Sequence, residues 1–258
     1  MIPDPLITGG LAGLYCGPAP DPGAIWGRWN LDPLLLAALA ALALGIGRSW
    51  AGLAAVAALA VAFVSPLCAL SAALFSARVV HHLLLVALAA PLIALALPAK
   101  VPRGATPLFL IATAVLWAWH LPQAYDAAMA NMGLYWVMQV TLLGTATAFW
   151  RAVLAPGQPT GQAGLAILGA YMQMGLLGAL LTFAPDPLYA IHQWAPLSWG
   201  FTPLSARWWR CGPGGGCRGG RHDRVARAGH PPPQGPARHR AGAVGRRPVR
   251  PAGHAGAP

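Results

Sequence analysis

Four histidines before residue 205 are the side chains of this sequence best suited to chemistry: His81, His82, His120 and His192. Neutral imidazole is a common ligand of copper, zinc and iron. Each histidine could instead make a hydrogen bond between helices. His81 and His82 are adjacent, and successive helical residues turn by about 100°, so the two cannot serve one site equally. Arg78 lies one turn before His82 on the same helical face.

Two methionines add a second kind of candidate ligand. Met172 and Met174 flank Gln173 within one apolar run. Thioether sulfur is a soft ligand that suits Cu(I). Because the two side chains would point to nearly opposite faces of a helix, at most one of them should face a given site. The alternative is that both methionines fill gaps between helices.

Other kinds of chemistry have little support in the sequence. It contains no nucleophile–base–acid set, no HExxH motif and no glycine-rich phosphate loop. Its four cysteines form no CxxC pair and match no zinc-site spacing. No carboxylate lies clearly within an apolar run, whereas a proton-driven transporter would normally need one. We therefore expect a protein that is not an enzyme.

The composition indicates that lipid is the solvent for most of the chain. Hydrophobic residues make up 57% of the 258 residues and charged residues only 9%. A soluble domain usually carries about 25% charged residues. So few charges cannot cover a water-facing surface of this size, and a multi-pass protein of the cell (plasma) membrane is expected.

The apolar residues fall into runs close to the roughly 20 residues that cross a bilayer as a helix. Small residues within the runs favour close helix packing in lipid. The sequence therefore predicts an all-α polytopic transmembrane helix bundle with about six spans in a domain of residues 1–205. The predicted spans are Leu31–Gly47, Ala51–Leu70, Val79–Leu97, Pro107–Trp119, Leu134–Phe149 and Ala163–Phe183.

Basic residues predict the orientation of the bundle. If six spans alternate, the connections that carry Arg48, Lys100 with Arg103, and Arg151 lie on one face. Lysine and arginine concentrate in cytoplasmic loops, so this face should be cytoplasmic and the N-terminus outside. All four histidines would then lie at the outer face.

The last 53 residues, 206–258, have a different chemistry. They hold eleven arginines and one aspartate, whereas residues 1–205 hold six basic and five acidic residues, so most of the net charge of +11 belongs to this tail. Its glycine and proline content and its lack of apolar periodicity predict disorder. Arg, Gly, Pro, Ala and His are also what GC-rich codons encode in a wrong frame, so a frameshift near residue 205 is a second hypothesis. No nucleic-acid-binding motif accompanies the charge.

Three stretches share one resemblance. The first contains Ser65-Pro66-Leu67, then residues 74–85 with the two adjacent histidines, then Ala90-Pro91-Leu92. The second joins the Trp-His-Leu-Pro sequence at 119–122 to residues 125–128 and to Phe149-Trp150. The third runs through residues 178–183, 187–189, 192, 199–200 and 203–204. Together they resemble the multi-span CtaG-type cytochrome c oxidase assembly factors over roughly residues 60–204.

The resemblance implies a factor that matures the copper-containing haem oxidase at its buried copper centre. His82, His120 and His192 match recurring histidines of the family, and copper is the implied metal. The chain departs from the family at Arg78, where another histidine is frequent, and in residues 135–139. It also departs after Leu204, where Ser205-Ala206-Arg207-Trp208-Trp209 replaces Asp-Gln-Gln and a final span, which strengthens the frameshift hypothesis.

The sequence thus predicts a membrane assembly factor for a respiratory cytochrome c oxidase. Its metal ligands would be His82, His120 and His192, with Met172 or Met174 as auxiliaries. Its partners would be the oxidase subunits and membrane lipid, and not nucleic acid. Three alternatives remain open: a transporter of metal or another small solute, a haem-binding membrane redox protein with two axial histidines, and a purely structural scaffold for oxidase subunits.

Overall fold

The computed structural model describes residues 14–98, 104–185, 188–192 and 195–201. All of these belong to one unit, Met1–Pro213. The predictions for Lys100, Arg103 and the tail at 206–258 concern residues outside the described ones.

The described part of the chain is helical and contains no strand, as the sequence predicts. The α-helices are α2 (Pro33–Ile46), α3 (Trp50–Phe63), α4 (Leu67–Ala73), α5 (Phe75–Leu83), α6 (Ala90–Ala96), α7 (Ala105–His120), α8 (Pro122–Ala130), α9 (Met132–Val153) and α10 (Thr160–Phe183). A π-helix, η2 (Leu84–Ala89), joins α5 to α6, and short 3-10 helices are η1 (Pro22–Gly27), η3 (Ala190–His192) and η4 (Ala195–Trp199).

Polar residues and prolines determine where the helices begin. The side chains of Asp32, Ser49 and Asn131 accept hydrogen bonds from backbone N–H groups in the first turns of α2, α3 and α9. Pro33 and Pro122 stand at the first positions of α2 and α8, where no intrahelical N–H bond is needed. The predicted breaks at 47–49, 65–66 and 156–159 fall between helices, and most of the one at 98–102 lies outside the described residues.

Fewer helices meet the requirements for a membrane span than the sequence predicts. Among the residues that the structure describes, two helical segments are long and apolar enough, Phe75–Ala96 and Thr160–Phe183. The count rises to as many as four if the bent pairs α3 with α4 (45°) and α7 with α8 (73°) each make one span. Six spans are therefore not confirmed. The 14 residues of α2 rise only about 21 Å, short of the roughly 30 Å apolar core of a bilayer.

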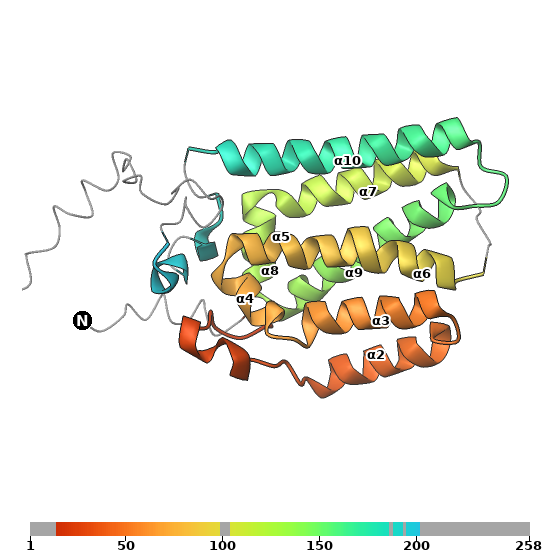
Figure 1. The fold of residues 1–258 in the computed structure, drawn as a ribbon. Helices are drawn as coiled ribbons and strands as arrows, with labels where there is room; N and C mark the ends of the chain where they lie inside the picture. The colour runs from red at the N-terminus through yellow and green to blue at the C-terminus, as the bar shows by residue number, and fades with distance from the viewer. Residues whose placement is uncertain (1–13, 99–103, 186–187, 193–194, 202–258) are drawn as a thin grey trace, which may run out of the picture. The chain divides into compact units, whose positions relative to one another are not determined.

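Helix α9 is the centre of the packing. It contacts α6, α7, α8, α10 and η2 (Figure 1). By contrast, α10 lies along α7 at the edge of the bundle and buries only Leu177 and Leu181. Helix α3 packs on η2 and α6 through small buried residues such as Ala55, Ala58 and Ala62. Small side chains let helix backbones approach closely, which is the main source of helix association in lipid.

A disulfide fastens the segment before α2 to the helix bundle. Cys16 is bonded to Cys68 in α4, and the Cys16 sulfur lies 3.7 Å from the Tyr135 hydroxyl of α9. Beside it, the ring of Tyr15 stacks on that of Tyr135, with centroids 5.3 Å apart. The Tyr15 hydroxyl donates a 2.7 Å hydrogen bond to the carboxylate of Asp32.

The bond between Tyr15 and Asp32 acts on both pKa values. Burial, followed by this hydrogen bond, raises the pKa of the Tyr15 phenol above its usual value. The same bond, followed by the one from the Leu34 N–H, lowers the pKa of the Asp32 carboxyl. The phenol therefore stays protonated and the carboxylate ionised at neutral pH, which are the states that this hydrogen bond needs.

Candidate functional site

The candidate ligands come together at one end of the bundle, which we call the histidine end. It is the end where α5 and α9 begin and where α7 and α10 finish, at the left of Figure 1. His81 and His82 lie in α5, His120 is the last residue of α7, and His192 lies in η3. The helices alternate in direction, so residues far apart in the sequence meet here.

His82 and His120 form the closest histidine pair. Their ring centroids are 5.3 Å apart and their planes nearly perpendicular, at 86°. The Nε2 atom of His82 is buried and has no hydrogen-bond partner. An orphaned buried ring nitrogen costs free energy unless a ligand or ion satisfies it. This pair is therefore the part of the predicted ligand set whose geometry best fits a shared metal ion.

The backbone of α7 fixes the tautomer of His120. Its Nδ1 lies 2.7 Å from the carbonyl oxygen of Leu116, one turn earlier. A carbonyl oxygen can only accept, so Nδ1 carries the proton and Nε2 carries the lone pair. This is the arrangement in which metal-binding histidines are usually oriented, with the second ring nitrogen donating to a carbonyl or carboxylate. The Tyr189 hydroxyl donates to the carbonyl oxygen of His120 itself, at 3.0 Å, which ties the segment after α10 to the end of α7.

The other two histidines have different surroundings. The ring of His81 packs edge-on against Phe63 of α3, with centroids 4.9 Å apart. His81 and His82 thus have different ring partners, as the helical turn between neighbours predicts. His192 is buried, and its Nε2 is 3.0 Å from the Tyr125 hydroxyl. His192 therefore lies at the histidine end, in hydrogen-bond contact with the Tyr125 phenol.

The two methionines differ in position. Met174 lines the cavities beside His82, whereas 64% of Met172 is exposed on the outer face of α10. Met174 can therefore contribute sulfur close to the histidine pair. The helical spacing predicts that at most one of the two methionines faces a given site, but it does not predict which one.

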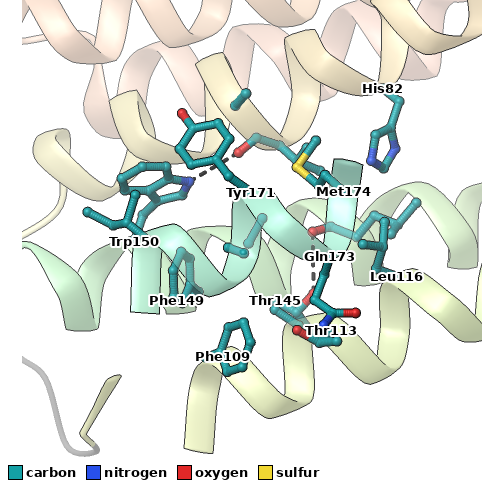
Figure 2. Close-up of a pocket in the computed structure, with 17 residues that line it drawn as sticks. His82, Phe109, Thr113, Leu116, Thr145, Phe149, Trp150, Tyr171, Gln173 and Met174 are labelled. Carbon is teal, nitrogen blue, oxygen red and sulfur yellow. Dashed lines mark hydrogen bonds between the residues drawn. The ribbon is translucent and has the colours of Figure 1, made fainter. Parts of the chain in front are cut away.

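Two adjoining cavities lie between α5, α7, α9 and α10. The larger one, about 350 Å³, is lined by Arg78, His82, His120 and Gln139 among mostly apolar side chains. The smaller one, about 80 Å³, shares His82 and Met174 with it and is lined in part by aromatic rings (Figure 2).

The π-helix η2 forms part of the wall of the smaller cavity, directly after the two histidines. A π-turn leaves backbone groups without their usual helical partners. The indole N–H of Trp150, in α9, donates to the carbonyl oxygen of Val86 at 3.1 Å and so supplies one partner from another helix (Figure 2). Such π-helical turns are frequent at functional sites.

Arg78 is buried in the larger cavity. Its guanidinium lies 5.6 Å from the ring centroids of both Tyr125 and Tyr135. Cations are attracted to aromatic faces, so this pair of rings stabilises the charge in part. Arg78 stands where the family resemblance leads one to expect a further histidine, and it brings a permanent positive charge instead.

Within the described ranges, no three side chains of the types His, Cys, Asp and Glu converge closely enough to hold a metal ion. The chemistry available at the histidine end is therefore two-coordinate imidazole binding by His82 and His120 with a nearby thioether. Cu(I) accepts soft and imidazole ligands. Metal binding by the five predicted residues stays a prediction.

Sequence reasoning missed two features of this end. One is the Cys16–Cys68 disulfide, because 52 positions separate the two cysteines and they form no recognisable motif. The other is the π-helix, because apolar Leu and Ala residues at 84–89 give no signal that distinguishes it from an α-helix.

Comparison with known families shows which family the chain belongs to. The family model described as cytochrome c oxidase caa3 assembly factor matches residues 35–110 and 105–209. The chain belongs to this family. Its members are cytochrome c oxidase assembly factors, and the resemblance seen in the sequence is confirmed. The matched residues include His82, His120 and His192, and the match ends four residues into the predicted tail. No curated protein and no solved structure matches the chain.

Membership gives this assembly factor its partner and setting. It acts in the assembly of cytochrome c oxidase, so the oxidase or its assembly intermediates are its partners. Its apolar helices make it a membrane protein.

Proposed function

We propose that this assembly factor delivers Cu(I) to the copper centre of the oxidase, with His82 and His120 as the transient ligands. Copper is a cargo here and not a resident cofactor, and no covalent reaction is catalysed. The observation that carries the proposal is the pairing of the two rings, at 5.3 Å, with the Nε2 atom of His82 lacking any partner. The lone pair on Nε2 of His120 supports it further.

An open two-histidine site suits a cargo that must leave again. A closed four-ligand site holds its metal for structural purposes, whereas an incomplete ligand set leaves positions for exchange. Met174 adds a soft sulfur that favours Cu(I) over harder cations. His192 keeps its predicted role from the family resemblance, and its bond to Tyr125 would have to open before it could bind copper.

We further propose that the histidine end faces the outside of the cell. Disulfides form and persist in oxidising compartments, and the Cys16–Cys68 bond joins two segments at this end. At the opposite end, Arg151 donates to the carbonyl oxygen of Pro98, after α6, and Arg48 follows α2. Basic residues at that end suit the cytoplasmic side.

The first experiment measures Cu(I) affinity and oxidase copper together. The purified full chain competes with a chromogenic Cu(I) chelator, and the same variants complement a deletion strain whose oxidase copper is determined. Loss of an outer-shell partner alone weakens metal sites about tenfold or more, so His82→Ala and His120→Ala should each weaken Cu(I) binding at least tenfold and lower oxidase copper. His81→Leu is the matched control and should retain both.

Three results would contradict the proposal. One is a wild-type chain without measurable Cu(I) affinity, and another is equal losses in all three variants. The third is normal oxidase copper in the histidine variants, which would favour the scaffold alternative. A deletion that leaves oxidase assembly unchanged would question the family role itself in this host.

A further inference from the structure

The larger cavity at the histidine end has more hydrogen-bond donors than acceptors. Arg78 offers five N–H groups and cannot lose its charge. The side-chain Nε2 of Gln139, an N–H donor, is buried in the same wall without a partner. The Nε2 atoms of His81 and His82, in the same lining, are also buried without a partner. A ligand with acceptor oxygens would satisfy these unpaired donors.

Arg78 lacks a negative partner within the described part of the chain. Only 8% of the residue is exposed, and the side chains that act on its charge are the phenols of Tyr125 and Tyr135. No carboxylate is among them. A buried cation that is stabilised only by aromatic faces and phenols is left largely uncompensated, and removing a charge from water costs several kcal/mol. An anion in the cavity would offset this cost with charge-assisted hydrogen bonds.

Apart from these polar groups the cavity is lined by apolar side chains, and on the side of α10 it is lined partly by glycines. Val79, Leu116, Leu142 and Leu177 line the space around the polar groups. At about 350 Å³ the cavity has the size of small-molecule sites, which start near 300 Å³. Helix α10 closes it with Gly175 and Gly178, neither of which has atoms near the position of an added Cβ.

The outer face of α10 carries exposed apolar side chains that suit contact with lipid. Met172, Leu176 and Leu180 are each at least half exposed there. A ligand from the lipid phase could therefore enter the cavity past this lightly packed helix.

We propose that the cavity between α5, α7, α9 and α10 binds an amphiphile with an oxyanion headgroup, the oxyanion on Arg78 and Gln139 and the apolar body against α10. The chemistry shared by possible sources is a carboxylate or phosphate on a hydrocarbon chain, as in a fatty acid or an anionic phospholipid. The inference does not rest on copper handling, because its donors are different side chains.

The test titrates the delipidated full chain, in neutral detergent and without copper, with oleate at a pH that ionises its carboxyl. Native mass spectrometry counts the bound molecules. We expect one saturable oleate per chain, displaced by oleoyl lysophosphatidate but at least tenfold less effectively by oleyl alcohol, which has the same tail without the charge. Relative affinities of the two anions distinguish a fatty-acid source from a phospholipid source.

Variants assign the site. Arg78→Gln should weaken oleate binding at least tenfold, Gln139→Leu should weaken it less, and Arg78→Lys should retain most of it. Arg48→Gln, which removes an exposed cation at the opposite end of the bundle, is the matched control and should bind as wild type. Equal displacement by oleyl alcohol overturns the proposal, and so does wild-type affinity in a folded Arg78→Gln chain. The comparison of oleate with oleyl alcohol uses only the wild-type chain, so it holds even if Arg78→Gln does not fold.

Discussion

At the scale of single residues, the site depends on which nitrogen or sulfur of each side chain is available. The Nδ1 of His120 contacts the carbonyl oxygen of Leu116 in its own helix. The lone pair on the other ring nitrogen, Nε2, is therefore directed away from this contact. The ring of His81 packs edge-on against Phe63 instead, because neighbouring helical residues point in different directions. The residue type alone carries none of this information, because each of these partners comes from the fold.

The two methionines give a prediction at this scale. Met174→Ala should weaken Cu(I) binding by the purified chain severalfold, because it removes a soft sulfur beside His82. Met172→Ala should leave the affinity unchanged, because that side chain is 64% exposed on the other face of α10. Competition with a Cu(I) chelator measures both variants. Equal effects of the two substitutions would show that neither sulfur takes part.

At the scale of elements, helix breaks could be predicted and details of packing could not. The glycines, prolines and serines at 47–49, 65–66 and 156–159 are local signals, and these predicted breaks lie between helices in the structure. The number of spans is a different matter. The predicted span Ala51–Leu70 contains Ser65-Pro66, where the chain bends by 45° between α3 and α4. The predicted span Pro107–Trp119 ends just before the 73° bend between α7 and α8. In α9, Gln139, Thr141 and Thr145 make the helix less apolar than its length suggests.

The turn between α2 and α3 gives a prediction about stability. A Cβ at Gly52 would collide with the backbone carbonyl of Ile46, which cannot move aside as a flexible side chain could. Gly52→Ala should therefore lower the free energy of unfolding by about 1–3 kcal/mol, as overpacking generally does. Gly144→Ala in α9 meets open space and is the control, with no loss expected. Unfolding of the detergent-purified proteins followed by near-UV circular dichroism measures the difference. Equal stability of the two variants would mean that the two helices do not approach as closely as described.

At the scale of the whole molecule, the histidines could be assigned to one end of the bundle from the sequence because alternating helices bring alternate connections together. Their mutual contacts could not be inferred. His82 meets His120 and His192 meets Tyr125 because of how α5, α7 and α8 are rotated and bent, and rotation leaves no trace in composition or spacing. The cavity beside Arg78 likewise arises from the light packing of α10.

Membrane orientation gives a prediction at this scale. With Cys211 and Cys217 changed to serine and the Cys16–Cys68 bond intact, Ser198→Cys reports on the histidine end and Arg48→Cys on the opposite end. Both positions are exposed. A membrane-impermeant maleimide applied to intact cells should label Ser198→Cys directly and Arg48→Cys only after permeabilisation. The reverse pattern would put the histidine end in the cytoplasm and would contradict delivery from outside.

The Cys16–Cys68 bond also determines what a protease could do to this protein. The bond closes a covalent loop of the chain that contains α2 and α3. The turn at Arg48, between these two helices, is part of this loop. A single cut in that turn breaks the chain but separates nothing, because the two pieces remain linked through sulfur. In denaturing gel electrophoresis, such a nicked molecule would migrate as one species until reductant is added. Its Tyr15 would stay against Tyr135, so damage to the loop would spare the histidine end.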